Sequence, residues 1–88
     1  MSVKTLLVKY IQNSEKVFAE MKLNRDARVQ SPNIVTEVIE YAKRYLSDAK
    51  YYAEKQQHET GLVSVAYCEG MLDALRLLGL VEFTWPNT

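Results

Sequence analysis

Apolar residues recur at alternating steps of four and three over the first quarter of the chain. The series runs through Val3, Leu7, Tyr10, Ser14, Val17 and Met21, and Leu6 and Phe18 widen it. Most of the charged residues in this segment fall elsewhere on the helical wheel. This spacing is typical of one face of an amphipathic helix, and it predicts a helix over residues 3–23.

A second helix is predicted over residues 32–56. Ser31 and Pro32 form a start signal, because serine can cap free amides and proline at the first helical position loses only an amide without a partner. The apolar positions that follow have heptad-like spacing: Val35, Val38, Ala42, Tyr45, Ala49 and Tyr52.

A third helix is predicted over residues 59–78, with Gly79 as its C-terminal stop. It is apolar over most of its circumference, and the polar interruptions are few: Ser64, Glu69, Asp73 and Arg76. A helix of this kind is one that several neighbours cover. We therefore expect it to lie between the other two helices or to face a second subunit.

Residues 80–88 follow the last helix as a C-terminal arm. Apolar and polar residues alternate from Val81 to Trp85, which fits either a short strand or an extended arm on the bundle. We favour the arm, because a lone strand has no evident partner in this chain. The groove it covers belongs either to its own subunit or to a neighbour, and we favour an arm-exchanged dimer. The chain is thus predicted to be one all-α domain over residues 1–88, an up-and-down three-helix bundle with a short extended arm.

Two rows of small residues predict how the second and third helices pack. Ala42, Ala49 and Ala53 line one helix, while Ala66, Gly70 and Ala74 form a row at steps of four on the other. Small residues let helix backbones approach closely, so we expect Gly70 at the contact between the two helices. A turn centred between His58 and Glu59 places Ala49 opposite Cys68 and Arg44 level with Asp73.

Two segments of this predicted hairpin resemble a known family. They are Tyr45-Leu46-Ser47-Asp48-Ala49-Lys50-Tyr51-Tyr52 and Val65-Ala66-Tyr67-Cys68-Glu69-Gly70-Met71-Leu72-Asp73-Ala74-Leu75-Arg76-Leu77-Leu78-Gly79. Over residues 41–80 the chain is similar to the archaeal family called Domain of Unknown Function 357 (DUF357). The resemblance implies a short archaeal protein, an up-and-down three-helix bundle and no established activity. It supplies no catalytic residue.

Charge and composition argue against several functions. The 88 residues include 11 basic and 11 acidic side chains, so the overall basic excess of most nucleic-acid-binding proteins is missing and nucleic acid is an unlikely partner. The charge is uneven, however. Residues 1–31 carry six basic and three acidic groups, and residues 59–88 carry one and four. Solvated helix faces are the simpler interpretation, and head-to-tail association or contact with an acidic partner is the alternative.

The chain offers little material for catalysis or metal binding. It has one cysteine, Cys68, and one histidine, His58, too far apart along the predicted helix to act as a pair. We therefore expect no enzyme activity, no metal site and no cofactor. The first apolar run is too short for a signal peptide, and Asp73 and Arg76 interrupt the longest apolar stretch. These features, with a single thiol, predict a cytoplasmic protein that does not enter a membrane.

The six tyrosines are the unusual feature of the composition. Tyrosine is favoured in protein interfaces, although a ring of phenols around a core is the simpler interpretation. Asp73 is surrounded by apolar residues and needs a partner if buried, such as an arginine or a tyrosine across the helical hairpin. The candidate interaction surface comprises Tyr41, Tyr45, Tyr52, Tyr67, Asp73, Phe83 and Trp85. The leading hypothesis is a protein-interaction or self-association module. The alternative is a small-ligand or nucleic-acid-binding domain with a tyrosine-lined surface.

Overall fold

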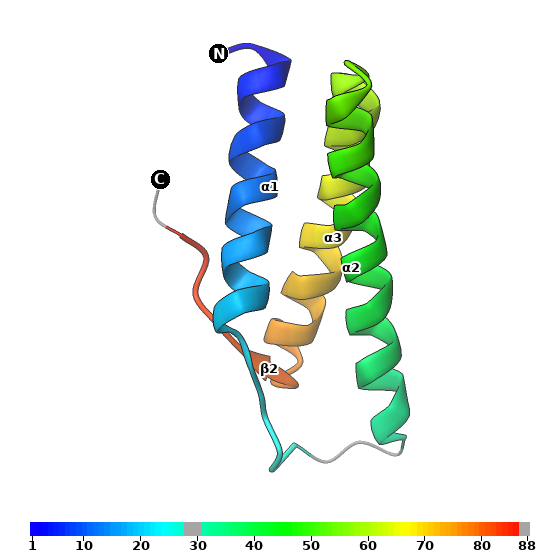
Figure 1. Cartoon of the computed structure of the whole chain (residues 1–88). Coiled ribbons are helices and arrows are strands. Elements are labelled where there is room, and N and C mark those ends of the chain that lie inside the picture. The colour runs from blue at the N-terminus through cyan, green and yellow to red at the C-terminus, as the bar shows by residue number, and fades with distance from the viewer. Residues whose placement is uncertain (28–30, 87–88) are drawn as a thin grey trace.

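A computed structural model describes residues 1–27 and 31–86, and in these residues three long helices stand side by side (Figure 1). They are α1 (Val3–Glu20), α2 (Pro32–Glu54) and α3 (His58–Leu77). Successive helices run in opposite directions, so the predicted all-α, up-and-down three-helix bundle is confirmed. Within the described ranges, no helix is long and apolar enough to cross a membrane.

The helix ends follow local signals in the sequence. The Ser2 hydroxyl accepts a hydrogen bond from the Thr5 backbone amide at 3.1 Å and caps α1. At the end of α3, Gly79 has φ +75°, and the Leu80 amide donates to the Leu75 carbonyl at 2.9 Å. This is the glycine stop that the sequence predicted. The start of α2 at Pro32 was also predicted, but the Ser31 side chain makes no capping hydrogen bond.

The main core cluster lies between the helices, a smaller one lies around Val35, Ile39, Leu75 and Val81, and α3 contacts both other helices. The buried members of the main cluster include Leu7 and Val17 from α1, Ala42 and Ala49 from α2, and Leu72 from α3. Each helix turns one face to this core, as the apolar spacing predicted for α1 and α2.

A short strand pair makes two predictions wrong, namely where the first helix ends and that the arm contains no strand. The first helix ends at Glu20 rather than at Leu23, because the next residues form β1 (Lys22–Leu23). This strand pairs antiparallel with β2 (Val81–Glu82), so that Leu23 lies opposite Val81. The arm was favoured over a strand because no partner strand was evident, and the structure provides that partner in Lys22 and Leu23, which were predicted to continue the first helix. Residues 87 and 88 of the predicted arm lie outside the described residues.

The predicted packing of α2 on α3 is wrong, because the turn between them centres on Gln56 (φ +62°) rather than beyond His58. This displaces the two helices along each other relative to the expected register. Ala49 lies beside Gly61 instead of Cys68, and a Cβ added to Gly61 would meet the Ala49 carbonyl oxygen at 3.3 Å. Gly61 is therefore the site of close approach. A Cβ added to Gly70 would meet nothing within 4 Å, so Gly70 is not at the helix contact.

Candidate interaction surface on the third helix

The side of α3 turned away from the core is apolar and exposed. We call it the outer face of α3, and it consists of Val63, Ala66, Tyr67, Gly70, Ala74 and Leu77. These positions recur at steps of three and four, which keeps them on one side of a helix. The core side of the same helix carries Gly61, Val65, Cys68, Leu72 and Leu75. Thus α3 has two apolar faces, and only one is covered within the described chain.

Exposure on the outer face is large for apolar side chains. Val63 is 57% exposed, Tyr67 58% and Leu77 75%. No outer-face position carries an ionisable acid or base apart from the Tyr67 phenol. Acidic groups lie beside this face, on the flank of α3 near the arm, where burial and the charge of Asp73 raise the pKa of the Glu69 carboxyl.

A shallow depression of about 490 Å³ runs along the outer face and is bordered by Met71 on the side toward α2. Its floor is the row of Ala66, Gly70 and Ala74, whose side chains are a methyl group or a hydrogen atom. Large side chains, including Val63 and Tyr67, stand around it. The surface thus alternates between raised and hollowed parts, as helices that pack on one another do.

Two of the predicted tyrosines lie at the depression, since Tyr67 lines it and Tyr45 packs on Tyr67. Tyr45 of α2 stacks on Tyr67 of α3, with ring centroids 5.2 Å apart and an interplanar angle of 20°. One turn earlier on α2, the exposed Tyr41 ring carries the Arg44 guanidinium 4.7 Å from its centroid. The fourth, Tyr52, packs near Gly61 instead, close to the helical hairpin turn.

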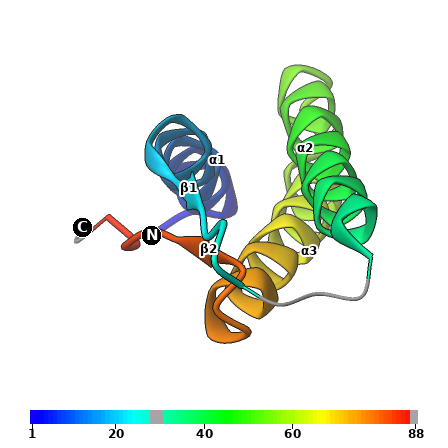
Figure 2. The same cartoon turned by 90° about the horizontal axis from the view of Figure 1, so that it is seen from below.

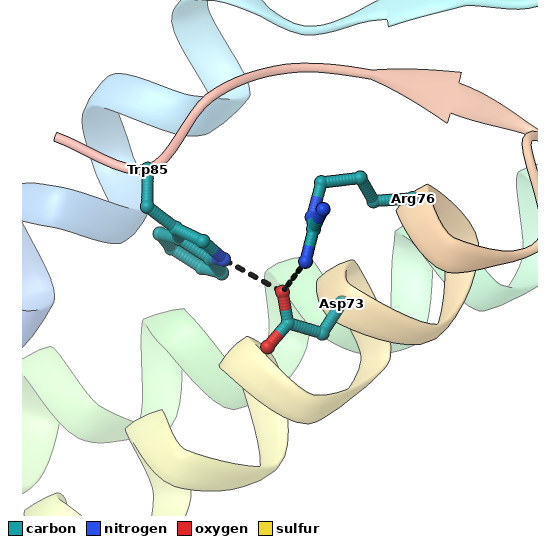
Figure 3. A network of polar contacts seen from close by, with 3 residues as sticks. All are labelled: Asp73, Arg76 and Trp85. Atoms are coloured by element: carbon teal, nitrogen blue, oxygen red, sulfur yellow. Dashed lines mark hydrogen bonds and ion pairs between the residues drawn. The ribbon is translucent and has the colours of Figure 1, made fainter.

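The remaining predicted residues form a separate cluster where the arm meets α3 (Figure 3). The Asp73 carboxylate accepts a hydrogen bond from Trp85 Nε1 at 2.6 Å and one from Arg76 at 3.3 Å. Phe83 packs edge-on against Trp85, with centroids 5.1 Å apart. The partners of Asp73 are therefore Arg76 of its own helix and the arm. The expected partner across the hairpin, Arg44 or a tyrosine, is not used.

The arm lies against its own chain, since both of its aromatic rings are half-buried and pack on the main core cluster. Phe83 and Trp85 are therefore part of the fold. The residues missed by sequence reasoning are Val63, Ala66, Gly70, Ala74 and Leu77 of the outer face. The row of small residues, Ala66, Gly70 and Ala74, is evident in the sequence, but the prediction put it at the contact between α2 and α3.

One titratable group inside the bundle is the buried thiol of Cys68. Burial raises the pKa of the Cys68 thiol to about 11. The thiol is thus protonated at neutral pH and is a weak nucleophile. Within residues 1–27 and 31–86, no three His, Cys, Asp or Glu side chains lie close enough together to hold a metal ion.

Comparison with known proteins gives one match. The model of a family described as protein of unknown function (DUF357) matches residues 9–81, more than half of the chain. The match extends the resemblance seen over residues 41–80 into the first helix. No curated protein and no solved structure matches the chain.

Proposed function

Because the chain belongs to the DUF357 family of proteins of unknown function, we propose a function from its surface. It is a non-catalytic protein-interaction module that docks a partner helix on the outer face of α3. The proposal needs no cofactor. A single free thiol suits a reducing compartment, so we place the module in the cytoplasm.

The observation that carries the proposal is the second apolar face of α3. A helix that is apolar on opposite sides is normally covered on both. Contiguous exposed apolar surface is uncommon on monomers and marks interaction sites. Covering it is favourable by about 25 cal/mol per Å² of apolar area removed from water. The small-residue row adds a shape that a second helix can enter.

A small apolar ligand is the second candidate for the same depression. Its volume of about 490 Å³ is within the range of ligand sites. However, every lining residue comes from the one helix α3, and most of them are exposed, so the depression encloses little of a ligand. Ligand sites usually bury most of the ligand surface, and this favours a helix as the occupant.

Nucleic acid is less well supported. Stacked rings such as Tyr45 and Tyr67 suit bases, but backbone binding also requires several basic groups. The outer face has none, and Arg44 is the basic group shown beside the tyrosines.

Photocrosslinking tests the proposal with a matched pair of tyrosines. Tyr67 on the outer face is 58% exposed, and Tyr51 on α2, outside this face, is 55% exposed. A benzophenone amino acid is placed at either position, and the protein is irradiated in extract of the organism that encodes it. We expect a specific protein adduct from position 67 and none from position 51.

A purified copy of the captured protein is then titrated against the wild type, Ala66→Glu and Ser47→Glu. Both substitutions add a carboxylate at an exposed helix position, but only the first lies on the outer face. Loss of binding in Ala66→Glu alone supports the proposal. Equal adducts from both tyrosines, no adduct, or binding that survives Ala66→Glu would overturn it.

A further inference from the structure

We propose that the partner on the outer face of α3 is a second copy of this chain, with the two α3 helices antiparallel and centred on Gly70. This inference rests on the proposed function and names its partner.

Apart from Tyr67, which would lie opposite Asp73, the outer face has the same residue classes when it is followed in either direction from Gly70. Ala66 and Ala74 lie four positions away on each side, and Val63 and Leu77 lie seven positions away. In an antiparallel pair with a two-fold axis at Gly70, positions equally far from Gly70 on opposite sides meet. Alanine then lies against alanine, and Val63 of each copy meets Leu77 of the other. A two-fold contact requires such self-complementarity.

No close contact within residues 1–27 and 31–86 requires a glycine at position 70. Glycine in a helix interior costs up to about 1 kcal/mol relative to alanine. A close intramolecular contact would explain this cost, but a Cβ at Gly70 would meet nothing within 4 Å. A contact between two copies gives the missing explanation, because small residues at the crossing point allow the shortest distance between helix axes.

The charge at the N-terminus of α3 favours the antiparallel arrangement over the parallel one. Glu59 is the charged residue in the first turn of α3. A parallel pair would bring the two Glu59 carboxylates and the two positive helix N-termini together at one end. In the antiparallel pair the two Glu59 residues lie about 33 Å apart, given a rise of about 1.5 Å per residue. Each helix N-terminus then lies near the C-terminus of the other helix, which is favourable for their dipoles.

The bundle leaves room for the second copy. Seen along the helices, α3 lies beside the space between α1 and α2, and the arm follows the side toward α1 (Figure 2). The outer face therefore points away from the other two helices. Because one helix face makes a small interface, at the low end for specific complexes, we expect a weak and concentration-dependent dimer.

Sedimentation equilibrium from about 10 μM to about 1 mM tests the association itself, a range that covers weak dimers. We expect the mass to rise from one chain of 10.1 kDa toward two. Gly70→Arg places two like charges at the two-fold axis and should remain monomeric over the whole range. Ser47→Arg, on an exposed part of α2, should associate as the wild type does. The open space around Gly70 means that Gly70→Arg should still fold, which circular dichroism checks.

Disulfide trapping tests the arrangement. Val63→Cys and Leu77→Cys chains are oxidised separately and as a mixture, while the buried Cys68 stays unreactive. We expect crosslinked dimers mainly from the mixture, because Val63 of one copy meets Leu77 of the other. Crosslinks mainly within each separate variant would show a parallel pair and overturn the arrangement.

A wild-type monomer at every concentration would overturn the second copy as partner. The proposed function would survive that result if the benzophenone at position 67 captures a different protein. Failure of the proposed function can thus be distinguished from failure of the proposed dimer.

Discussion

The indole Nε1 of Trp85 donates a 2.6 Å hydrogen bond to the carboxylate of Asp73. One residue belongs to the arm and the other to α3, so this contact fixes the end of the described chain on the bundle. Arg76 donates to the same carboxylate oxygen, and its guanidinium lies 5.9 Å from the Phe83 ring centroid. The cluster explains why an acidic residue stands within the apolar sequence of α3.

Trp85→Phe should lower the free energy of unfolding by about 1 kcal/mol, because the ring stays and the hydrogen bond to a charged group is lost. Asp73→Ala should have an effect of similar size, since it removes the acceptor. Asp48→Ala, at an exposed position on α2, is the control and should change stability by less than about 0.5 kcal/mol. Urea unfolding measures all three, and an unchanged midpoint for Trp85→Phe would contradict the prediction.

Phe83→Ala should release the arm from the bundle while Trp85 remains in the arm as a fluorescence reporter. Trp85 is the only tryptophan, so its emission reports the arm alone. Loss of the Phe83 ring exposes the indole to water, and we expect a red shift of the emission maximum. Tyr51→Ala, on an exposed side chain of α2, should leave the emission maximum unchanged.

The two glycines of α3 should respond to alanine in opposite ways. In Gly61→Ala the new methyl group meets Leu7 Cδ2 at 2.8 Å and the Ala49 carbonyl oxygen at 3.3 Å, so we expect destabilisation by about 1–3 kcal/mol. In Gly70→Ala the new methyl group meets nothing within 4 Å. The higher helix propensity of alanine should therefore raise the unfolding free energy, by about 1 kcal/mol at most. Melting curves at low protein concentration compare the two, and equal shifts would contradict this assignment.

Gln56→Gly should stabilise the protein. Gln56 has φ +62°, a conformation that costs a residue with a side chain about 1–2 kcal/mol and glycine much less. Gln57 has φ −101°, where glycine brings no such gain, so Gln57→Gly is the matched control. A higher melting temperature for Gln56→Gly alone would support the turn geometry. A higher melting temperature for Gln57→Gly than for Gln56→Gly would contradict it.

Raising the pH should destabilise the fold through Cys68. The thiol has a pKa near 9.0 when unfolded and about 11 in the bundle, so the native state retains its proton longer. Its contribution to stability is complete below pH 9 and is lost as the pH rises toward 11. The unfolding free energy of wild type should therefore fall more steeply over this interval than that of Cys68→Ala. Parallel curves would contradict the prediction.

The helices were predictable because their signals are local. Alternating steps of three and four placed α1 and α2, and Ser31-Pro32 and Gly79 placed two of the ends. The pairing of Leu23 with Val81 has no such signal, because the two strands contain two residues each and lie at opposite ends of the sequence. Alternation from Val81 to Trp85 was compatible with a strand, but the two residues of β1 are too few for alternation to identify its partner.

The candidate surface was predicted only in part, for a physical reason. When a helix is apolar all round, its spacing does not tell which face turns inward. That choice depended on the turn at Gln56, whose left-handed backbone sets the register of α3 on α2. The sequence identified the tyrosines on the α2 side. It predicted Gly70 and its alanine neighbours at the contact between α2 and α3, whereas they lie on the exposed side of α3.

The strand pair also determines the order in which the bundle can assemble. The α2–α3 hairpin joins neighbours in sequence through a short turn, so its contacts close a small loop and can form early. Once that hairpin has formed, it holds the segments of Leu23 and Val81 closer together, and their pairing closes a ring that contains both helices. The cost in chain entropy grows only slowly with the length of such a ring. We therefore expect the smallest element of the fold to form last, and α1 to gain its second attachment to the bundle at that step.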